Sequence, residues 1–191
     1  MEKQIINLLL VDDDEDDYLL TSEYLNDIKS KKFNITYAST FDKAVEKLKG
    51  GTYDILIFDF LLGIKTGLDL VVKTFELGSD APIILLTGKG DVKIDMEAMR
   101  LGVADYLVKS DLDSEKLDRS IRYALERSAA MRSLRESEEK YRTIFERTRD
   151  MIYITDEKGN FIDINESAIR IFGYSRAGFK KINALDLYYN Y

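Results

Sequence analysis

The sequence predicts an α/β protein with a doubly wound, five-stranded parallel sheet, an extended C-terminal helix and then a partial α+β segment. Two observations predict this class. Short apolar runs alternate with helical patterns between residues 5 and 114, which is typical of a parallel sheet with helices on both faces. The run Ile-Leu-Ile-Phe at 55–58 contains no polar residue, which indicates a central strand that is buried on both sides.

The expected elements follow one another in a regular order. Helices are expected where apolar residues recur every three or four positions, and strands where a short apolar run ends in a polar residue or a turn. Asp14 or Asp16 is a natural N-cap of the first helix, and Asp91 of the fourth; Gly50-Gly51 and Gly78 follow the second and third helices. The expected strands are 5–11, 33–38, 55–58, 82–86 and 105–108, and the expected helices are 18–28, 41–48, 67–75, 91–99 and one that starts near Ser114.

The last of these helices is predicted to continue well beyond the sheet. Its apolar positions first follow alternating steps of four and three, as in a coiled coil, although this half fits a helix packed on its own domain equally well. The pattern then resumes in a displaced register, and the charge-rich stretch 132–142 has no Gly or Pro, which indicates a helical linker and a parallel dimer stalk. The positions concerned are Leu117, Ile121, Ala124, Ser128 and Met131, and then Leu134, Tyr141 and Phe145.

A different pattern follows Arg149. Residues 151–155 and 161–165 read as a hairpin around a Gly-Asn turn, and a short helix at 166–172 ends at Gly173. These elements are too few for an independent core, so this portion is expected to be half of a domain. The expected division is a first domain at 1–127, a helical or coiled-coil linker at 128–140 and a truncated domain at 141–191.

Composition restricts the chemistry that the chain can perform. The 191 residues carry a net charge of −7 with a pI near 4.8, so the chain lacks the electrostatic footprint of a nucleic-acid-binding protein. No apolar stretch is long enough to span a membrane, and neither a signal peptide nor cysteine is present, so a cytoplasmic protein is expected. The chain has no histidine, which excludes histidine acid/base catalysis and histidine metal ligands within it. Carboxylate, hydroxyl, lysine and hard-metal chemistry remain.

Polar residues that suit this chemistry follow four of the five predicted strands. The carboxyl ends of parallel strands share one edge of the sheet, where such folds bind ligands. Converging carboxylates require a cation, and oxygen ligands predict Mg²⁺, with Mn²⁺ as a possible substitute. Asp59 would be a nucleophile that forms an aspartyl phosphate, with Lys109 and Thr87 bonded to the phosphoryl oxygens. The predicted metal ligands are Asp12, Asp13 and Asp59, and Gly88 leaves space above the site.

These residues resemble the receiver domain of two-component response regulators, a flavodoxin-like fold, over residues 5–134. The matching motifs are Leu-Leu-Val-Asp-Asp at 9–13, Asp59 with Gly67 eight residues later, Leu-Leu-Thr-Gly at 85–88, and Gly-Val-Ala-Asp-Tyr-Leu-Val-Lys at 102–109. The resemblance implies a phosphoacceptor module in a phosphorelay, rather than a conventional enzyme. Its implied phosphodonor is a histidine kinase, a phosphotransfer protein or a small molecule, and its implied switch consists of Thr87 and Tyr106.

The chain departs from the family pattern near the phosphoacceptor. Gly63 replaces a loop proline, which is expected to loosen that loop. Ser110 replaces the proline after the lysine, so a trans peptide bond is expected there. Leu61 and Lys89 occupy positions that tune the phosphoryl lifetime in the family, and the apolar Leu61 predicts slow dephosphorylation.

Residues 138–191 resemble the N-terminal half of a PAS sensory domain. The motifs are Ser-Glu-Glu-Lys-Tyr-Arg-Thr-Ile-Phe-Glu at 137–146, Ile-Tyr-Ile-Thr-Asp-Glu-Lys-Gly-Asn-Phe-Ile-Asp-Ile-Asn at 152–165 and Ile-Phe-Gly-Tyr-Ser at 171–175. The chain has no histidine for haem and no cysteine for a flavin adduct. A dimerising role without a bound cofactor is therefore expected for this portion, with output passing through the long helix.

Three alternatives compete with the receiver interpretation. Asp12, Asp14, Asp16 and Glu23 have the spacing of an EF-hand calcium loop, but Asp17 replaces its glycine and a strand precedes it. Residues 14–17 are then expected to be solvated acids at the start of a helix, although one of them could reach the water shell of the metal. An Asp-nucleophile phosphohydrolase commonly has a general acid two residues after the nucleophile, where this chain has leucine. A scaffold that works without phosphorylation would have no physical reason to keep like charges together.

Overall fold

The structure is a computed structural model that describes residues 5–88 and 92–185, with only the backbone described at 92–95. The chain divides into two compact units, residues 1–130 and 131–191. Asp91 and Lys89, predicted as a helix cap and as a site residue, lie outside the described residues.

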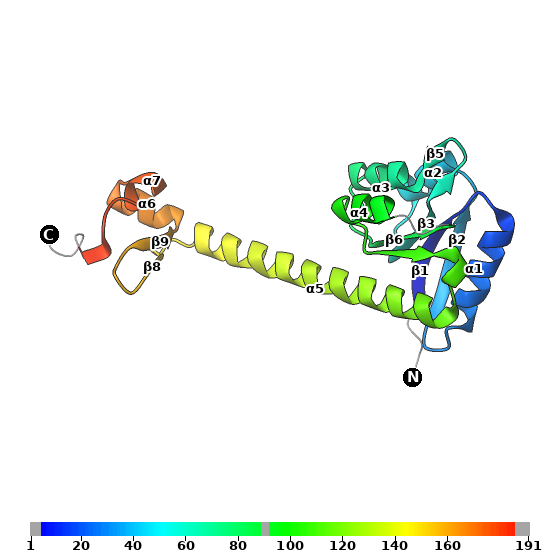
Figure 1. The fold of residues 1–191 in the computed structure, drawn as a ribbon. Helices are drawn as coiled ribbons and strands as arrows, with labels where there is room; N and C mark the ends of the chain where they lie inside the picture. Colours follow the sequence, from blue (N-terminus) through cyan, green and yellow to red (C-terminus); the bar gives the residue numbers. More distant parts are fainter. Residues whose placement is uncertain (1–4, 89–91, 186–191) are drawn as a thin grey trace. The chain divides into compact units, whose positions relative to one another are not determined.

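The first unit is built on a five-stranded parallel sheet, as predicted (Figure 1). Its strand order is β2-β1-β3-β6-β7, so the chain order reverses at β1 and the sheet is doubly wound. Every strand ends within one residue of its predicted end. The strands are β1 (Ile5–Val11), β2 (Lys32–Ala38), β3 (Ile55–Asp59), β6 (Ile83–Thr87) and β7 (Asp105–Val108).

Helices cover both faces of this sheet because alternate strand residues point to opposite sides. The helices are α1 (Glu15–Asp27), α2 (Phe41–Gly50), α3 (Gly67–Glu76), α4 (Val92–Arg100) and α5 (Ser114–Arg147). On one face, Leu56 and Phe58 of β3 share a buried cluster with residues of α2, α3 and α4. On the other, Ile55 and Ile57 share a cluster with residues of α1 and α5. Buried residues on both sides explain why β3 has no polar residue before Asp59.

The first helix begins where the acidic run predicts. Asp14 is its N-cap, and Oδ1 of Asp14 accepts hydrogen bonds from the backbone N–H groups of Asp16 (2.9 Å) and Asp17 (3.3 Å). Residues from Glu15 onward are therefore helical, and the calcium-loop alternative is wrong because a strand and a capped helix stand where it needs a helix and a loop.

The structure adds a short hairpin that the sequence analysis did not predict. It consists of β4 (Leu61–Leu62) and β5 (Lys65–Thr66), which lie directly between β3 and α3. Thr66 then caps α3 in a capping box with Asp69, whose carboxylate accepts hydrogen bonds from the Thr66 backbone N–H and hydroxyl. These bonds lower the pKa of Asp69 below its ordinary value. The hairpin is thus held next to the end of β3.

Helix α5 is continuous over 34 residues. Its first half packs on the first unit through Leu117, Ile121 and Ala124, which confirms the interpretation as a helix packed on its own domain. Every residue from 129 to 144 is exposed. Among the described helices, none is both long and apolar enough to cross a lipid bilayer.

The second unit contains the predicted hairpin and short helix. Its elements are β8 (Tyr153–Thr155), antiparallel to β9 (Phe161–Ile164), then α6 (Glu166–Phe172) and α7 (Arg176–Phe179). Gly173 ends α6 in the left-handed region at φ 76°, as the sequence predicts. A small apolar cluster lies in this unit and includes Phe161, Ile164 and Phe179.

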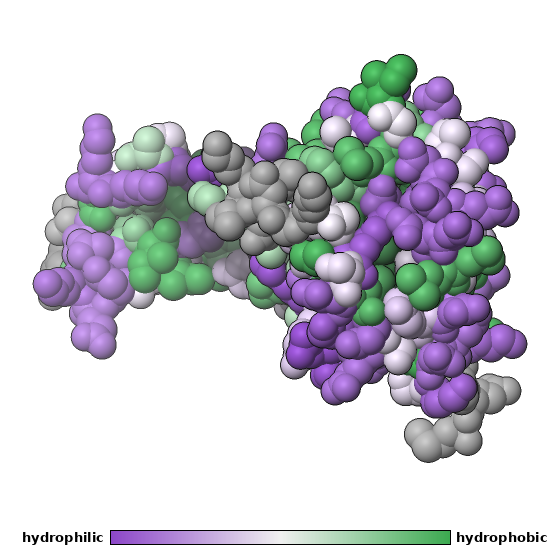
Figure 2. All heavy atoms as spheres, turned by 45° about the vertical axis from the view of Figure 1, so that its right-hand side comes forward, coloured by the Kyte–Doolittle hydropathy of each residue, from purple (hydrophilic) through white to green (hydrophobic). Residues whose placement is uncertain are grey.

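Hydrophilic side chains cover much of the surface in the view of Figure 2, with smaller hydrophobic groups between them.

Candidate functional site

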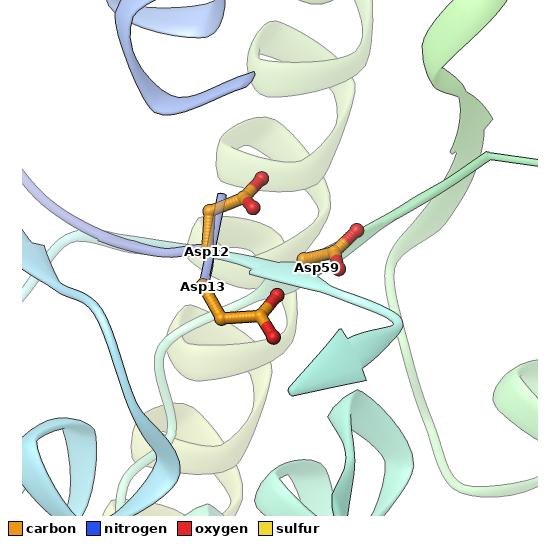
Figure 3. A group of neighbouring side chains, drawn as sticks. All are labelled: Asp12, Asp13 and Asp59. Atoms are coloured by element: carbon orange, nitrogen blue, oxygen red, sulfur yellow. The ribbon is translucent and has the colours of Figure 1, made fainter. Parts of the chain in front are cut away.

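Three carboxylates meet at the carboxyl edge of the sheet. Asp12 and Asp13 directly follow β1, and Asp59 ends β3. The two strands are paired with Val11 opposite Phe58, so the next residue of each lies at the same level of the sheet. One oxygen from each of the three carboxylates lies within 4.8 Å of the others, and Figure 3 shows the three side chains next to one another. The predicted convergence of these residues is therefore observed.

A single lysine neutralises part of this charge. The Nζ atom of Lys109, which follows β7, lies 2.8 Å from Oδ2 of Asp12 and 2.7 Å from Oδ1 of Asp59. It also lies 2.7 Å from Oδ2 of Asp17 in α1. Asp12 is fully buried and Asp59 is 5% exposed, whereas Asp13 is exposed. Three carboxylates thus contact one ammonium group and Asp13 lies beside them, so the site is strongly negative.

Burial and charge together shift the pKa values of these groups. Burial is the largest effect on Asp12 and raises its pKa to about 6, against the lowering effect of its hydrogen bond with Lys109. Burial likewise raises the pKa of Asp59, and Lys109 again opposes the shift. Burial would lower the pKa of Lys109, but its hydrogen bonds with Asp12, Asp17 and Asp59 raise it overall. The lysine is therefore charged at neutral pH.

Backbone N–H groups fix the carboxylates in place. The N–H of Asp14 donates to Oδ1 of Asp12 (3.0 Å), and the N–H of Leu61 donates to Oδ2 of Asp59 (3.0 Å). The N–H of Gly63 donates to Oδ2 of Asp13 (2.9 Å). A proline at position 63 could not make this bond. Gly63 therefore bonds the loop to Asp13. The sequence predicted only that the loop would be looser without a proline.

The remaining predicted residues lie at or near the same edge. Thr87 ends β6, is buried, and stands one position beyond Leu86, the β6 partner of Asp59. Tyr106 of β7 is half-buried, pairs with Leu85 and packs against the cluster shared by α2, α3 and α4. An added Cβ on Gly88 would meet no atom of the described residues within 4 Å, in keeping with the predicted open space. The structure contains no cis peptide bond among its described residues, so the bond before Ser110 is trans, as expected.

Two residues in contact with the site were not predicted. Asp17 was grouped with the other acids at the start of α1 and expected to be solvated, but its carboxylate is bonded to Lys109. The hydroxyl of Tyr37 donates to the carbonyl oxygen of Asp12 (3.0 Å), and its ring stacks on Tyr18 at a centroid distance of 3.9 Å. With Asp14 as cap, Asp17 is the third helical residue, in the turn beside the strand ends. This position in the first turn is the feature of the sequence that could have indicated the contact between Asp17 and the site.

The donor set fits a hard divalent cation. Asp12, Asp13 and Asp59 offer oxygen ligands only, which suit Mg²⁺ and Mn²⁺. The exposed Asp13 leaves the group open to solvent on one side, so that water could complete the shell of such a cation.

Replacing Asp13 should weaken the binding of a divalent cation without unfolding the protein. We expect Asp13→Asn to lower the Mg²⁺ affinity roughly tenfold or more, because it removes a charged ligand from the set. The exposed side chain makes only a small contribution to the core. Isothermal titration with Mg²⁺ measures the affinity. Asp16→Asn removes the same charge from an exposed neighbour, and equal affinities in the two variants would contradict the assignment of Asp13.

The fold and the site together define a class of protein. A doubly wound five-stranded parallel sheet with three aspartates and a lysine at one edge has the arrangement of a receiver domain. The chain belongs to the response regulator receiver domain family, whose profile matches residues 8–122. A PAS domain profile matches residues 139–190.

Curated relatives and solved structures agree with this membership. The chain is 27% identical over 128 residues to the transcriptional regulatory protein DltR of Streptococcus agalactiae, covering 67% of this chain and 55% of DltR. It is 26% identical over 141 residues to the response regulator protein TodT of Pseudomonas putida, covering 69% of this chain and 62% of TodT. The signal receiver domain of an HD domain-containing protein from Pseudomonas fluorescens Pf-5 is similar with a TM-score of 0.60 and 25% identity, covering 70% of this chain and 96% of that one.

One relative matches across both units. The regulatory protein LuxO of Vibrio vulnificus is 25% identical over 190 residues, which cover 90% of this chain but only 41% of LuxO. The chain therefore spans about 41–62% of the length of these three curated relatives.

Proposed function

We propose that Asp59 accepts a phosphoryl group from a histidine kinase, a phosphotransfer protein or a small phosphodonor, and that this modification switches the receiver. The observation that carries the proposal is the set of contacts at the sheet edge. A nearly buried carboxylate lies beside two further carboxylates that suit a divalent cation and within 2.7 Å of an ammonium group.

The reaction is a displacement at phosphorus. An oxygen of the Asp59 carboxylate forms a bond to the phosphorus atom while the bond to the leaving group breaks, and the leaving group departs with the electron pair. With acetyl phosphate the products are the aspartyl phosphate and acetate. Asp59 needs no general base because it is already ionised when Lys109 and a cation balance its charge.

The surrounding residues would bind and orient the transferred group. Mg²⁺, held by Asp12, Asp13 and Asp59, would offset the charge on the phosphoryl oxygens. Lys109 would donate to one of those oxygens, and the hydroxyl of Thr87 to another. The N–H of Leu61 holds the second oxygen of Asp59. These groups support a single modification of the protein itself, and the apolar side chain of Leu61 offers no acid or base for rapid hydrolysis.

The conformational change would be transmitted from the site to helix α5. A bond between Thr87 and the phosphoryl group would pull the end of β6 inward, and Tyr106 on the neighbouring strand would follow. Strand β7 is tied to α5 because the hydroxyl of Ser120 donates to Oδ2 of Asp105 (2.6 Å). Movement of β7 would thereby reach the helix that leads to the PAS-like unit.

Two alternative functions predict different experimental outcomes. A scaffold that works without phosphorylation would not gain a phosphoryl group on Asp59. A phosphohydrolase would turn over phosphate esters, but the position of its general acid is occupied by Leu61, whose backbone N–H is bonded to Asp59.

Intact-mass spectrometry tests the proposal. We expect the full chain to gain one phosphoryl group with acetyl phosphate and Mg²⁺, and none with EDTA or in Asp59→Asn. Asp54→Asn is the matched control, because Asp54 lies at the opposite end of β3, where it accepts a hydrogen bond from the N–H of Asn7. Absence of the gain, or a gain in Asp59→Asn, would overturn the proposal.

We also propose that α5 pairs with α5 of a second copy in a parallel dimer. Met131, Leu134 and Tyr141 are exposed on the fully exposed part of α5 and fall on one side of it. A second helix covering this side would remove their apolar surface from water.

Substitution of one seam residue should dissociate this dimer. We expect Leu134→Glu to shift the chain to monomer, with a dissociation constant raised roughly tenfold or more, since it buries a charge in the seam. Thr143→Glu adds the same charge at an exposed position on the opposite side of the helix and should leave the dimer intact. Sedimentation velocity reports the oligomeric state, and a monomeric parent chain would refute the pairing.

A further inference from the structure

The ammonium group of Lys109 has no hydrogen left for another acceptor. It has three hydrogens and makes three short contacts, with Asp12 at 2.8 Å, Asp17 at 2.7 Å and Asp59 at 2.7 Å. A phosphodonor that approaches the still ionised Asp59 requires one of these hydrogens, so one of the three carboxylates has to give up its bond before the new bond to phosphorus is complete.

The burial of the three carboxylates decides which bond is released. The side chain of Asp12 is fully buried and that of Asp59 is 7% exposed, so either one would lose a charge partner that water cannot replace. The side chain of Asp17 is 41% exposed, and water can replace its bond to Lys109. Asp17 is therefore the partner that Lys109 loses at least cost.

The position of Asp17 in α1 favours this exchange. It lies in the first turn of the helix, and its backbone N–H is bonded to the capping residue Asp14. The N-terminal end of the helix dipole stabilises a negative charge there. The carboxylate of Asp17 can thus remain ionised and in place after Lys109 has turned to another acceptor.

We propose that Asp17 is an exchangeable partner of Lys109 that holds the ammonium group while Asp59 is unmodified and competes with the incoming phosphoryl group for it. This inference rests on the proposed phosphorylation of Asp59 and adds a residue that regulates it. Asp17 positions Lys109 and takes no part in bond making. Its negative charge near the site also opposes the approach of an anionic phosphodonor.

The rate of phosphorylation tests this role. We expect Asp17→Asn to be phosphorylated by acetyl phosphate about two- to fivefold faster than the parent chain at equal Mg²⁺, the range that an exposed ion pair can supply. Asp17→Glu, which keeps the charge, should remain close to the parent rate. Asp16→Asn, which removes an equal charge from an exposed side chain of the same turn, should also remain close to it.

Salt provides a second readout that a merely structural role would not affect. Salt screens the carboxylate of Asp17, whose side chain is 41% exposed, so the advantage of Asp17→Asn should shrink as the ionic strength rises from about 0.05 M to about 0.5 M. An equal or slower rate in Asp17→Asn, with the parent chain phosphorylated, would overturn the role of Asp17 alone. A parent chain that gains no phosphoryl group would overturn the role together with the proposed function.

Discussion

Lys109→Met is expected to lower the free energy of unfolding of the metal-free protein by roughly 3 kcal/mol at pH 7.5. The methionine keeps most of the aliphatic stem but removes the cation that Asp12 and Asp59 share. Two nearly buried carboxylates would then face each other without compensation. Phosphorylation should also become at least about tenfold slower, because the ammonium group that contacts the phosphoryl oxygens is lost.

The stability difference should shrink as the pH falls to 5. The pKa of Asp12 is about 6 in the folded chain and 3.8 as its ordinary value, so the folded state binds the proton more tightly and its stability declines as the pH rises through this range. Lys109 lowers that pKa, so its removal would extend the decline to higher pH. Denaturant unfolding in EDTA at pH 5 and 7.5 measures both effects.

A surface lysine gives the matched control for this experiment. Lys73 forms an exposed pair with Glu76 at 2.9 Å, and Lys73→Met should change the stability by about 0.5 kcal/mol or less. A deficit of Lys109→Met that is the same at pH 5 and pH 7.5 would contradict the electrostatic account and assign the effect to packing.

Gly67→Ala is expected to destabilise the protein by about 2–3 kcal/mol and to impair phosphorylation. Gly67 is the first residue of α3, and a Cβ atom there would lie 2.3 Å from the carbonyl oxygen of Asp59 and 3.0 Å from Cδ2 of Leu85. The backbone of the phosphoacceptor itself would have to shift. A displacement of this kind should slow phosphoryl transfer roughly tenfold or more.

Another helical glycine separates the steric effect from helix propensity. Gly50 is the last residue of α2, and a Cβ atom there would meet no atom within 4 Å. Gly50→Ala should therefore be neutral or stabilise the chain by up to about 1 kcal/mol. Thermal unfolding and the mass-based phosphorylation assay compare the two variants. If Gly67→Ala were as stable and as active as Gly50→Ala, the close approach of α3 to Asp59 would be refuted.

The fold was predictable because its signals are local. An unbroken apolar run such as 55–58 predicts a buried parallel strand, and Asp14 caps α1 through neighbours two and three residues away. The convergence of Asp12, Asp13 and Asp59 was predictable as well, since parallel strands that end in polar residues share one edge.

Contacts between residues far apart in the sequence could not be predicted in the same way. Asp17 meets Lys109 from 92 positions away, and Gly63 meets Asp13 from 50 positions away. Gly63 has no pattern that would mark its pairing, and the place of Asp17 in the first turn of α1 does not indicate Lys109 as its partner. Asp17 was therefore grouped with its solvated neighbours, and Gly63 was judged only by the proline that it replaces.

The most direct test of the central claim is to locate the phosphoryl group by reductive trapping. Borohydride reduces an acyl phosphate to an alcohol with release of phosphate, so a phosphorylated Asp59 would be converted to homoserine, whereas an unmodified aspartate would not. Peptide mass spectrometry after treatment with acetyl phosphate and Mg²⁺ should find homoserine at position 59, and none when EDTA is present. An unreduced Asp59 in a protein that has gained a phosphoryl group, or a group attached to another residue, would contradict the account.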